Sequence, residues 1–146
     1  MKSELKKILD IIDKAIPYHI IFLLKAQNEI LISTSAKHDH ISESNESVID
    51  CAFRTNWIER AHNNYTLRLN ESLDQTFVGF CSQLSGRERA YASYSEFVKT
   101  EAEIKELESK IKAIKSQIRK ERQFNKKVNL NIVLKGLRKQ LELLTI

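Results

Sequence analysis

The sequence contains little glycine and proline, with three Gly and one Pro among 146 residues. Gly- and Pro-rich stretches mark flexible linkers, collagen-like repeats and low-complexity segments. Their scarcity argues against all three and favours regular helices and strands. At this length we expect one domain with an appendage.

Long apolar runs are also missing. The longest is Ile20–Leu24, whereas a transmembrane helix needs about 20 apolar residues. No charged-apolar-small signal segment opens the chain. The two cysteines, Cys51 and Cys81, do not have metal-type spacing. We therefore expect a cytoplasmic protein without membrane contact, in which both cysteines are reduced, small core residues.

Catalytic motifs are a third absence, because there is no Gly-rich phosphate loop, nucleophile elbow or zincin motif. We predict no catalytic residue, cofactor or metal site. His38-Asp39-His40 resembles a metal tripod only superficially, since metal sites need three or four converging ligands. His19 lies in an apolar segment and is expected to be a hydrogen-bonded core residue. A nuclease or hydrolase built from scattered carboxylates remains an alternative to a non-enzymatic protein.

The most informative pattern that is present lies in the last third of the chain. Two apolar series are spaced three and four residues apart, as on one face of a helix. Paired from the inside outward, the residue numbers of each pair sum to 248. This mirror symmetry predicts two antiparallel helices folded about Phe124. The paired residues are Ile118 with Leu130, Ile114 with Leu134, Ile111 with Leu137, Leu107 with Leu141, and Ile104 with Leu144.

A single continuous helix is the alternative to this hairpin. Ile118 and Leu130 are 12 residues apart, which does not return the second series to the face of the first at 3.6 residues per turn. We therefore predict a chain reversal near residues 123–127, where Asn125 readily accepts a left-handed backbone. A long helix paired with a second chain stays open. Ser93 followed by Glu96 predicts a capping box at the start of the first helix.

The preceding part of the chain reads as a small sheet domain. Helical spacing over residues 3–15 predicts a helix, and Ser72 with Gln75 predicts a capped helix that ends at Gly86. Between them, residues 36–47 are expected to form a loop, and Gln27-Asn28 a turn. The predicted strands are residues 18–25 (a central strand), 30–35, 48–58 and a short one carrying Tyr65, Leu67 and Leu69.

These elements predict an α+β fold. A four-stranded antiparallel meander is packed by helices, which we expect to cover one face of the sheet. The C-terminal antiparallel helical hairpin, which is coiled-coil-like, follows. The predicted division is an α+β body over residues 1–92 and a basic helical hairpin over residues 93–146.

Charge is distributed unevenly along the chain. Residues 1–95 hold 11 basic and 12 acidic residues, whereas residues 96–146 hold 13 and 7. Within residues 110–139 there are 11 basic residues and one acid, Glu121. A concentrated positive field attracts a polyanion, although Lys- and Arg-rich solvated helix faces are also common. The candidate residues at this basic tip are Lys110, Lys112, Lys115, Arg119, Lys120, Arg122, Lys126 and Lys127.

The outer face of the sheet is a second candidate. Polar side chains could lie together there across two strands, and Arg54 with Arg68 could hold an anion or a phosphate backbone. An ordinary exposed polar face is the alternative. The polar residues concerned are Asp50, Arg54, Asn56, Thr66 and Arg68. With the hairpin, the predicted nucleic-acid-binding residues are Lys112, Lys115, Arg119, Lys120, Arg122, Lys126, Lys127, Arg54 and Arg68.

Four stretches resemble a family of bacterial and archaeal proteins known as domain of unknown function 4391. They are IPYHIIF (residues 16–22), FRTNWI (53–58), LNESLDQTFVGFCSQL (69–84) and IRKERQFNKKVNLNIVLKGLRKQLELL (118–144). The resemblance implies no established activity. It implies genes near helicases and DNA methyltransferases of restriction-like defence systems, and a family N-terminal region of which this chain is expected to lack most.

We therefore expect a non-catalytic accessory module of a DNA-handling complex. Its basic hairpin would contact DNA or RNA backbone or an acidic partner surface, and its protein partners would be a helicase or a methyltransferase. The first alternative is a protein-interaction or oligomerisation module, such as a homodimer, without nucleic-acid binding. The second is the nuclease or hydrolase subunit.

Overall fold

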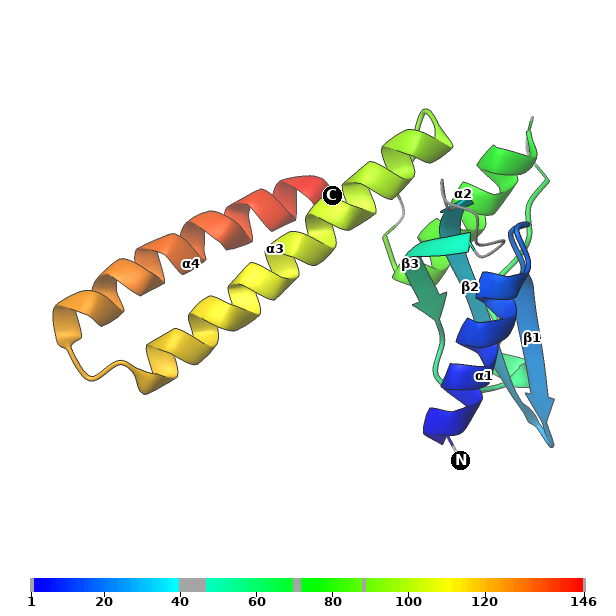
Figure 1. Cartoon of the computed structure of the whole chain (residues 1–146), viewed down its shortest axis with the longest axis horizontal. Coiled ribbons are helices and arrows are strands. Elements are labelled where there is room, and N and C mark those ends of the chain that lie inside the picture. The colour runs from blue at the N-terminus through cyan, green and yellow to red at the C-terminus, as the bar shows by residue number, and fades with distance from the viewer. Residues whose placement is uncertain (1, 40–46, 70–71, 88, 146) are drawn as a thin grey trace. The chain divides into compact units, whose positions relative to one another are not determined.

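The computed structural model describes residues 2–39, 47–69, 72–87 and 89–145 (Figure 1). The chain divides into two compact units, Met1–Gly86 and Arg87–Ile146. The first holds a four-stranded antiparallel sheet and two α-helices, and the second holds two long helices. The predicted α+β class, with a C-terminal helical hairpin, is confirmed.

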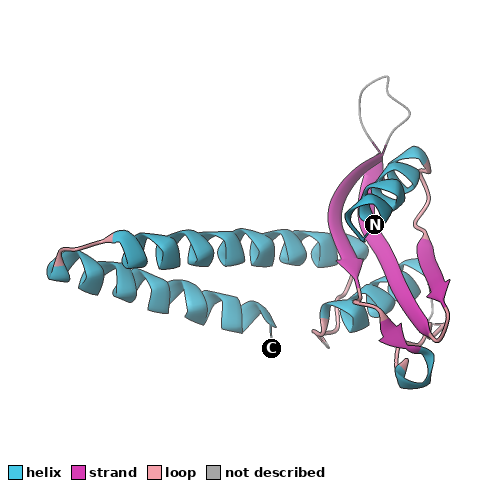
Figure 2. Cartoon of the chain, turned by 90° about the horizontal axis from the view of Figure 1, so that it is seen from below, coloured by secondary structure: helices cyan, strands magenta, loops and turns pink. Residues whose placement is uncertain are grey.

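The sheet of the first unit is built around one long strand. β2 (Glu29–Asp39) pairs with β1 (Ile21–Ala26) on one side, and with β3 (Ser47–Arg54) and β4 (Ile58–Glu59) on the other. Figure 2 shows the strands running side by side. The predicted loop over residues 36–47 is wrong at its ends, because β2 continues through Asp39 and β3 begins at Ser47. Its middle, residues 40–46, lies outside the described residues.

The apolar composition of β1 predicted a central strand, but β1 lies at an edge of the sheet. Its Ile21 and Leu23 side chains are 37% and 52% exposed. The following turn is correct, with Gln27 at φ 50°. Such a turn joins β1 directly to β2, so β1 becomes the outer strand of a hairpin.

The predicted strand over residues 48–58 is divided into β3 and β4. Thr55 lies between them and holds the chain against β2: its N–H donates to Ile32 O at 2.9 Å, and its hydroxyl accepts from Ile32 N–H at 3.0 Å. The predicted fourth strand at Tyr65, Leu67 and Leu69 is wrong, since these residues have no regular structure and Leu69 is 83% exposed. β4 is therefore the fourth strand.

α1 (Lys2–Ala15) and α2 (Leu73–Ser85) contact opposite faces of the sheet, which corrects the prediction that both cover one face. Phe80 of α2 packs with Ile30 and Ile32. Residues one place along β2 point the other way, and there Ser35 donates a hydrogen bond to Asp13 of α1. Figure 1 shows α1 crossing in front of the strands.

The ends of α2 follow the predicted chemistry. Ser72 Oγ accepts from Gln75 N–H at 3.1 Å, and Gly86 ends the helix at φ 69°. Both cysteines are buried and unbonded to one another, with Cys81 fully enclosed and Cys51 7% exposed, so their predicted place in the core is confirmed. Among the described residues, no helix has the length and apolarity to cross a membrane.

The second unit consists of α3 (Tyr94–Lys120) and α4 (Phe124–Thr145), which pack as a hairpin. Ser93 Oγ accepts from Glu96 N–H at 3.1 Å, as the capping box predicts. Ile104, Ile111 and Leu134 are buried, and the other seven residues of the two mirrored series are half-buried. We call these ten residues the apolar stripe.

Candidate nucleic-acid interface

The turn between α3 and α4 places the basic tip of the hairpin. The chain reverses at residues 121–123, a few residues before the predicted place, and Phe124 and Asn125 already belong to α4. Among the described residues only Gln27 and Gly86 have a positive φ, so the turn does not use a left-handed residue. Instead Glu121 has an extended backbone, and its Oε1 accepts from the N–H groups of Arg122 and Gln123 at 2.8 and 2.9 Å.

Glu121 therefore satisfies backbone donors where α4 begins, a position that favours negative charge. The hydrogen bond from Gln123 N–H is the largest cause that lowers the pKa of its carboxyl group. The bond from Arg122 N–H and the nearby charges of Lys126 and Lys127 act in the same direction. The single acid within residues 110–139 thus stabilises the turn through hydrogen bonds to its backbone.

One side of the hairpin carries the residues that come immediately before members of the apolar stripe. Two hollows, of about 480 and 360 Å³, lie between α3 and α4 on this side. Gln117 and Asn129 line the first with Lys120, Glu121 and Lys126. Lys110 lines the second, where its Nζ forms an ion pair with Glu106 Oε1 at 2.6 Å. Both cations and carboxylates occupy this side.

The opposite side carries the residues that immediately follow stripe positions. Successive residues of a helix are rotated by about 100°, so the residue after each stripe position lies on one flank of its helix. Because the two helices are antiparallel, these flanks of α3 and α4 lie on the same side of the hairpin. Lys127 lies three residues before Leu130, and at about 100° per residue its side chain is directed toward this flank as well. Glu108 and Glu142 also follow stripe positions on this side. We call the part of this side between residues 110 and 139 the cationic face, and define it by Lys112, Lys115, Arg119, Lys127, Lys135 and Arg138.

The cationic face is open to solvent. Five of its six side chains are exposed, and Lys127 is half-buried. Among the residues that the structure describes, none of the six forms an ion pair. Glu121 lines the hollow of the other side, so between residues 110 and 139 the cationic face bears positive charge alone. Its charges are available to a polyanion.

The part of the second unit farther from the turn is different. Arg87 pairs there with two glutamates, with Nη1 at 2.6 Å from Glu101 Oε2 and Nη2 at 3.3 Å from Glu108 Oε1. Glu101 is buried, and the Tyr91 ring packs edge-on against Phe97, with ring centroids 5.1 Å apart. Burial is the largest cause that raises the pKa of Tyr91. Charge is neutralised in this part and left open nearer the turn.

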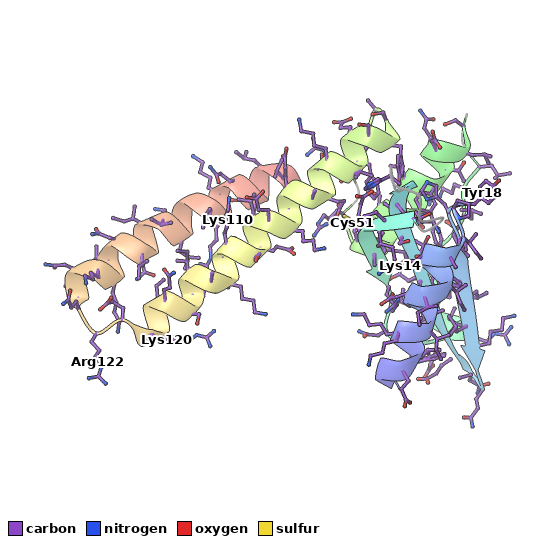
Figure 3. The ribbon with its side chains drawn as sticks, viewed as in Figure 1. Lys14, Tyr18, Cys51, Lys110, Lys120 and Arg122 are labelled. Carbon is purple, nitrogen blue, oxygen red and sulfur yellow. The ribbon has the colours of Figure 1, made fainter. Side chains whose placement is uncertain are left out.

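The structure separates the predicted binding residues of the hairpin into three places. Lys112, Lys115, Arg119 and Lys127 lie on the cationic face, whereas Lys120 and Lys126 line the hollow on the other side. Arg122 is exposed at the turn and projects away from both helices (Figure 3). Sequence reasoning missed Lys135 and Arg138, although each directly follows a stripe leucine and helical spacing could have placed them.

The predicted cluster on the sheet's outer face does not assemble. Arg54 lies on the face covered by α1, where its Nε donates to Ser33 Oγ at 3.0 Å and its Nη2 to Asp10 Oδ1 at 3.1 Å. Thr66 is in a segment without regular structure, held by backbone hydrogen bonds to the Gln83 side chain. Arg68 is exposed in the same segment, and Asn56 lies between β3 and β4. Arg54 thus links β3 to α1.

The histidines of the first unit do not assemble a metal site in the described residues, where no group of three or more metal-ligating side chains is found. His38 Nδ1 lies 2.9 Å from Asp50 Oδ2, and His40 lies outside the described residues. His19 is hydrogen-bonded to the backbone of Ser35, as predicted, but it is not a core residue, because its side chain is exposed and stacks on Phe77 at a centroid distance of 4.2 Å. Partial burial is the largest cause that lowers the pKa of His19.

Comparison with models of protein families assigns the chain to a family. The model described as Domain of unknown function (DUF4391) matches residues 2–141. The chain therefore belongs to this family, as its four resembling stretches had indicated. No curated protein and no solved structure matches the chain.

Proposed function

We propose that this protein is a non-catalytic accessory module that binds the phosphate backbone of nucleic acid through its cationic face, within a DNA-handling complex. The observation that carries the proposal is the cationic face itself: six basic side chains that form no ion pair among the described residues. Neutralising phosphates releases condensed counterions, which makes multivalent positive charge an effective binder.

The spacing of these side chains suits a backbone. Lys112, Lys115 and Arg119 are three and four residues apart, so they extend over about 10 Å of α3 at 1.5 Å per residue. A second row on α4 lies about 8–10 Å away, the usual distance between packed helices. Two helices abreast are too wide for the major groove, which is about 12 Å across and admits one helix. The cationic face therefore fits across phosphates, without reading bases.

The aromatic content supports the same mode. Phe124 is 77% exposed at the start of α4, but no second aromatic residue lies in the hairpin between residues 98 and 145. Binding of single strands by stacking uses several aromatic side chains along the strand. We therefore expect little preference for sequence, and strong dependence on salt.

The test is fluorescence anisotropy with a duplex of mixed sequence, measured across a salt series. Six phosphate contacts predict a slope of log K against log salt of about −5. The triple variant Lys112→Gln/Lys115→Gln/Arg119→Gln should reduce the slope by about 3 and weaken binding at low salt at least about tenfold.

The matched control is Lys6→Gln/Lys7→Gln/Lys14→Gln, three exposed lysines of α1. It lowers the formal net charge from +5 by the same three charges, and it should bind as the unchanged protein does. The proposal fails if the unchanged protein does not bind at low salt, or if both triple variants lose affinity equally.

A protein-interaction module is the second candidate, favoured by an apolar ridge on the outward side of α4. Phe124, Val128 and Ile132 follow one another at intervals of four residues and are 77%, 40% and 65% exposed. Exposed apolar rows at this spacing are used in helix-in-groove recognition. A Val128→Ser/Ile132→Ser variant that keeps nucleic-acid affinity but loses a protein partner would support this role.

A further inference from the structure

The outer edge of β1 offers a row of backbone groups for pairing. Among the described residues β1 pairs with β2 alone. An unpaired strand edge presents N–H and C=O groups that another strand can satisfy, and proteins usually protect such edges. Apolar side chains accompany this one, since Leu23 is 52% and Ile21 37% exposed.

The turn fixes which residues of β1 face the open edge. Ala26 and Glu29 flank the two-residue turn and form its closing, hydrogen-bonded pair. Hydrogen-bonded pairs recur at every second residue of an antiparallel ladder. Ile21, Leu23 and Lys25 therefore direct their N–H and C=O groups outward. The same alternation on β2 points Ile32 away from β1, where its carbonyl accepts from Thr55 N–H at 2.9 Å.

An apolar flank of α1 is directed toward the β1 side of the sheet. Asp10 reaches Arg54 on β3 at 3.1 Å, and Asp13 pairs with Lys37 on β2 at 2.8 Å. Ile8 and Ile12 lie on the other flank of the helix at about 100° per residue, on the side away from β3 and toward β1. They are 53% and 39% exposed.

We propose that β1 pairs antiparallel with β1 of a second copy of this chain, about a two-fold axis at Leu23. In this register Leu23 faces Leu23 of the second copy, Ile21 faces Lys25, and Phe22 faces Leu24. All outward N–H and C=O groups of Ile21, Leu23 and Lys25 are then hydrogen-bonded. The two sheets become one, and the α1 helices of both copies lie on the same face.

The strand is self-complementary, which is why a second copy is the occupant. Shifting the register by one residue would set outward-facing groups against inward-facing ones, and hydrogen bonds would be lost. Moving the axis to Lys25 would bring two like charges face to face, which destabilises a pair. With the axis at Leu23 the two lysines lie about 13 Å apart along the strands.

The flanking isoleucines add the burial that a strand pair lacks by itself. An isolated pair of strands is marginal in water, and stable dimers bury apolar side chains beyond the backbone ladder. With both α1 helices on one face, the flanks that carry Ile8 and Ile12 in the two copies are directed toward one another.

The first experiment is sedimentation velocity of the full chain across a concentration series. We expect a dimer that Leu23→Lys weakens at least about tenfold, because it places two lysines face to face on the axis and removes leucine burial. Ile132→Lys, at a residue that is 65% exposed on α4, is the matched control and should dimerise normally. Circular dichroism confirms that both variants are folded.

Two single cysteine variants test the register directly. Leu23→Cys should give a disulfide-linked dimer on mild oxidation with diamide, since directly opposite residues have Cα atoms about 5.5 Å apart. Lys25→Cys should not, because the two introduced thiols would be about 13 Å apart. The natural cysteines, Cys51 and Cys81, are buried.

Three results would overturn the proposal. A chain that stays monomeric at roughly 100 µM would leave the edge to a strand of another protein. A dimer that resists Leu23→Lys but dissociates with Ile132→Lys would place the contact on the ridge of α4. Crosslinking through Lys25→Cys and not Leu23→Cys would exclude the register. None of these results bears on nucleic-acid binding by the cationic face.

Discussion

The two units use their charged side chains in opposite ways. In the first, Lys37 is buried and its Nζ donates to Asp13 O, Asp13 Oδ1 and Ile16 O at 2.8, 2.8 and 2.7 Å. In the second, the cations near the turn extend into solvent without ion pairs among the described residues. A charge that fastens α1 to β2 is enclosed, whereas the charges of the cationic face are still available for binding.

The source of stability differs in the same way. The first unit buries polar groups that are each hydrogen-bonded, such as Ser33, Ser35 and Asp13, between α1 and the sheet. The hairpin is held by a single apolar stripe, with polar side chains directed outward. Buried polar groups are costly when a partner is removed, whereas stripe residues lose burial in proportion to their size. Substitutions in the two units separate these cases.

The largest effect is expected from Lys37→Met. It leaves the Asp13 carboxylate buried without its cation, and removing one partner of a buried pair costs about 3–5 kcal/mol. Urea denaturation measures the loss. Arg54→Met breaks a pair in which Arg54 and Asp10 are 20% and 40% exposed, and solvent screening should limit its cost to about 1 kcal/mol. Equal losses in the two variants would contradict the distinction.

A smaller effect is expected from Leu134→Ala in the hairpin. Leu134 is 8% exposed in the apolar stripe, and truncating a buried leucine costs about 2–5 kcal/mol, less where neighbours can close the cavity. Two packed helices can adjust, so we expect the lower part of this range. Ile132→Ala, at 65% exposure, should change the free energy of unfolding by no more than about 0.5 kcal/mol. Similar losses would mean that the stripe does not hold the helices together.

The smallest effect concerns Glu121 and pH. Its folded-state pKa is lowered, chiefly by the hydrogen bond from Gln123 N–H. A lowered carboxyl pKa contributes stability that is present above the unfolded-state pKa and is lost as pH falls through the folded-state value. Protection of the first amides of α4, measured by hydrogen exchange, should therefore decrease in acid.

Two variants serve as controls for this pH effect. Glu121→Gln should remove the acid-dependent step, because the amide side chain does not titrate in this range. Glu106→Gln should leave the first turn of α4 unchanged, although the hydrogen bond with Lys110 is the largest cause that lowers the pKa of Glu106. An acid-dependent step that persists in Glu121→Gln would assign it to another group.

The hairpin was predictable because its information is local and repetitive. The mirrored spacing of the stripe requires a reversal between Ile118 and Leu130, and the reversal lies there. The site of the turn was misplaced because Asn125 was expected to supply a left-handed backbone. The chain turns instead through the Glu121 carboxylate, which binds the amides of Arg122 and Gln123. Side-chain hydrogen bonds of this kind leave little signal in residue spacing.

The first unit was less predictable because its decisive contacts are distant in sequence. Arg54 pairs with Asp10 across 44 residues, which removes it from the predicted anion site. The apolar residues of β1 suggested a central strand, but order in a sheet depends on all pairings at once. Likewise, amphipathic spacing shows that α1 and α2 each have an apolar side without showing which face of the sheet that side covers.

The sequence by itself determined the helices, their caps at Ser72 and Ser93, the hairpin and the excess of positive charge near its turn. Those features depend on residues a few places apart, whose geometry the helix repeat fixes. The tertiary structure decided which cations of the described residues form ion pairs, and it left β1 at an edge. These outcomes depend on the packing of distant segments against one another, and local spacing does not encode that packing.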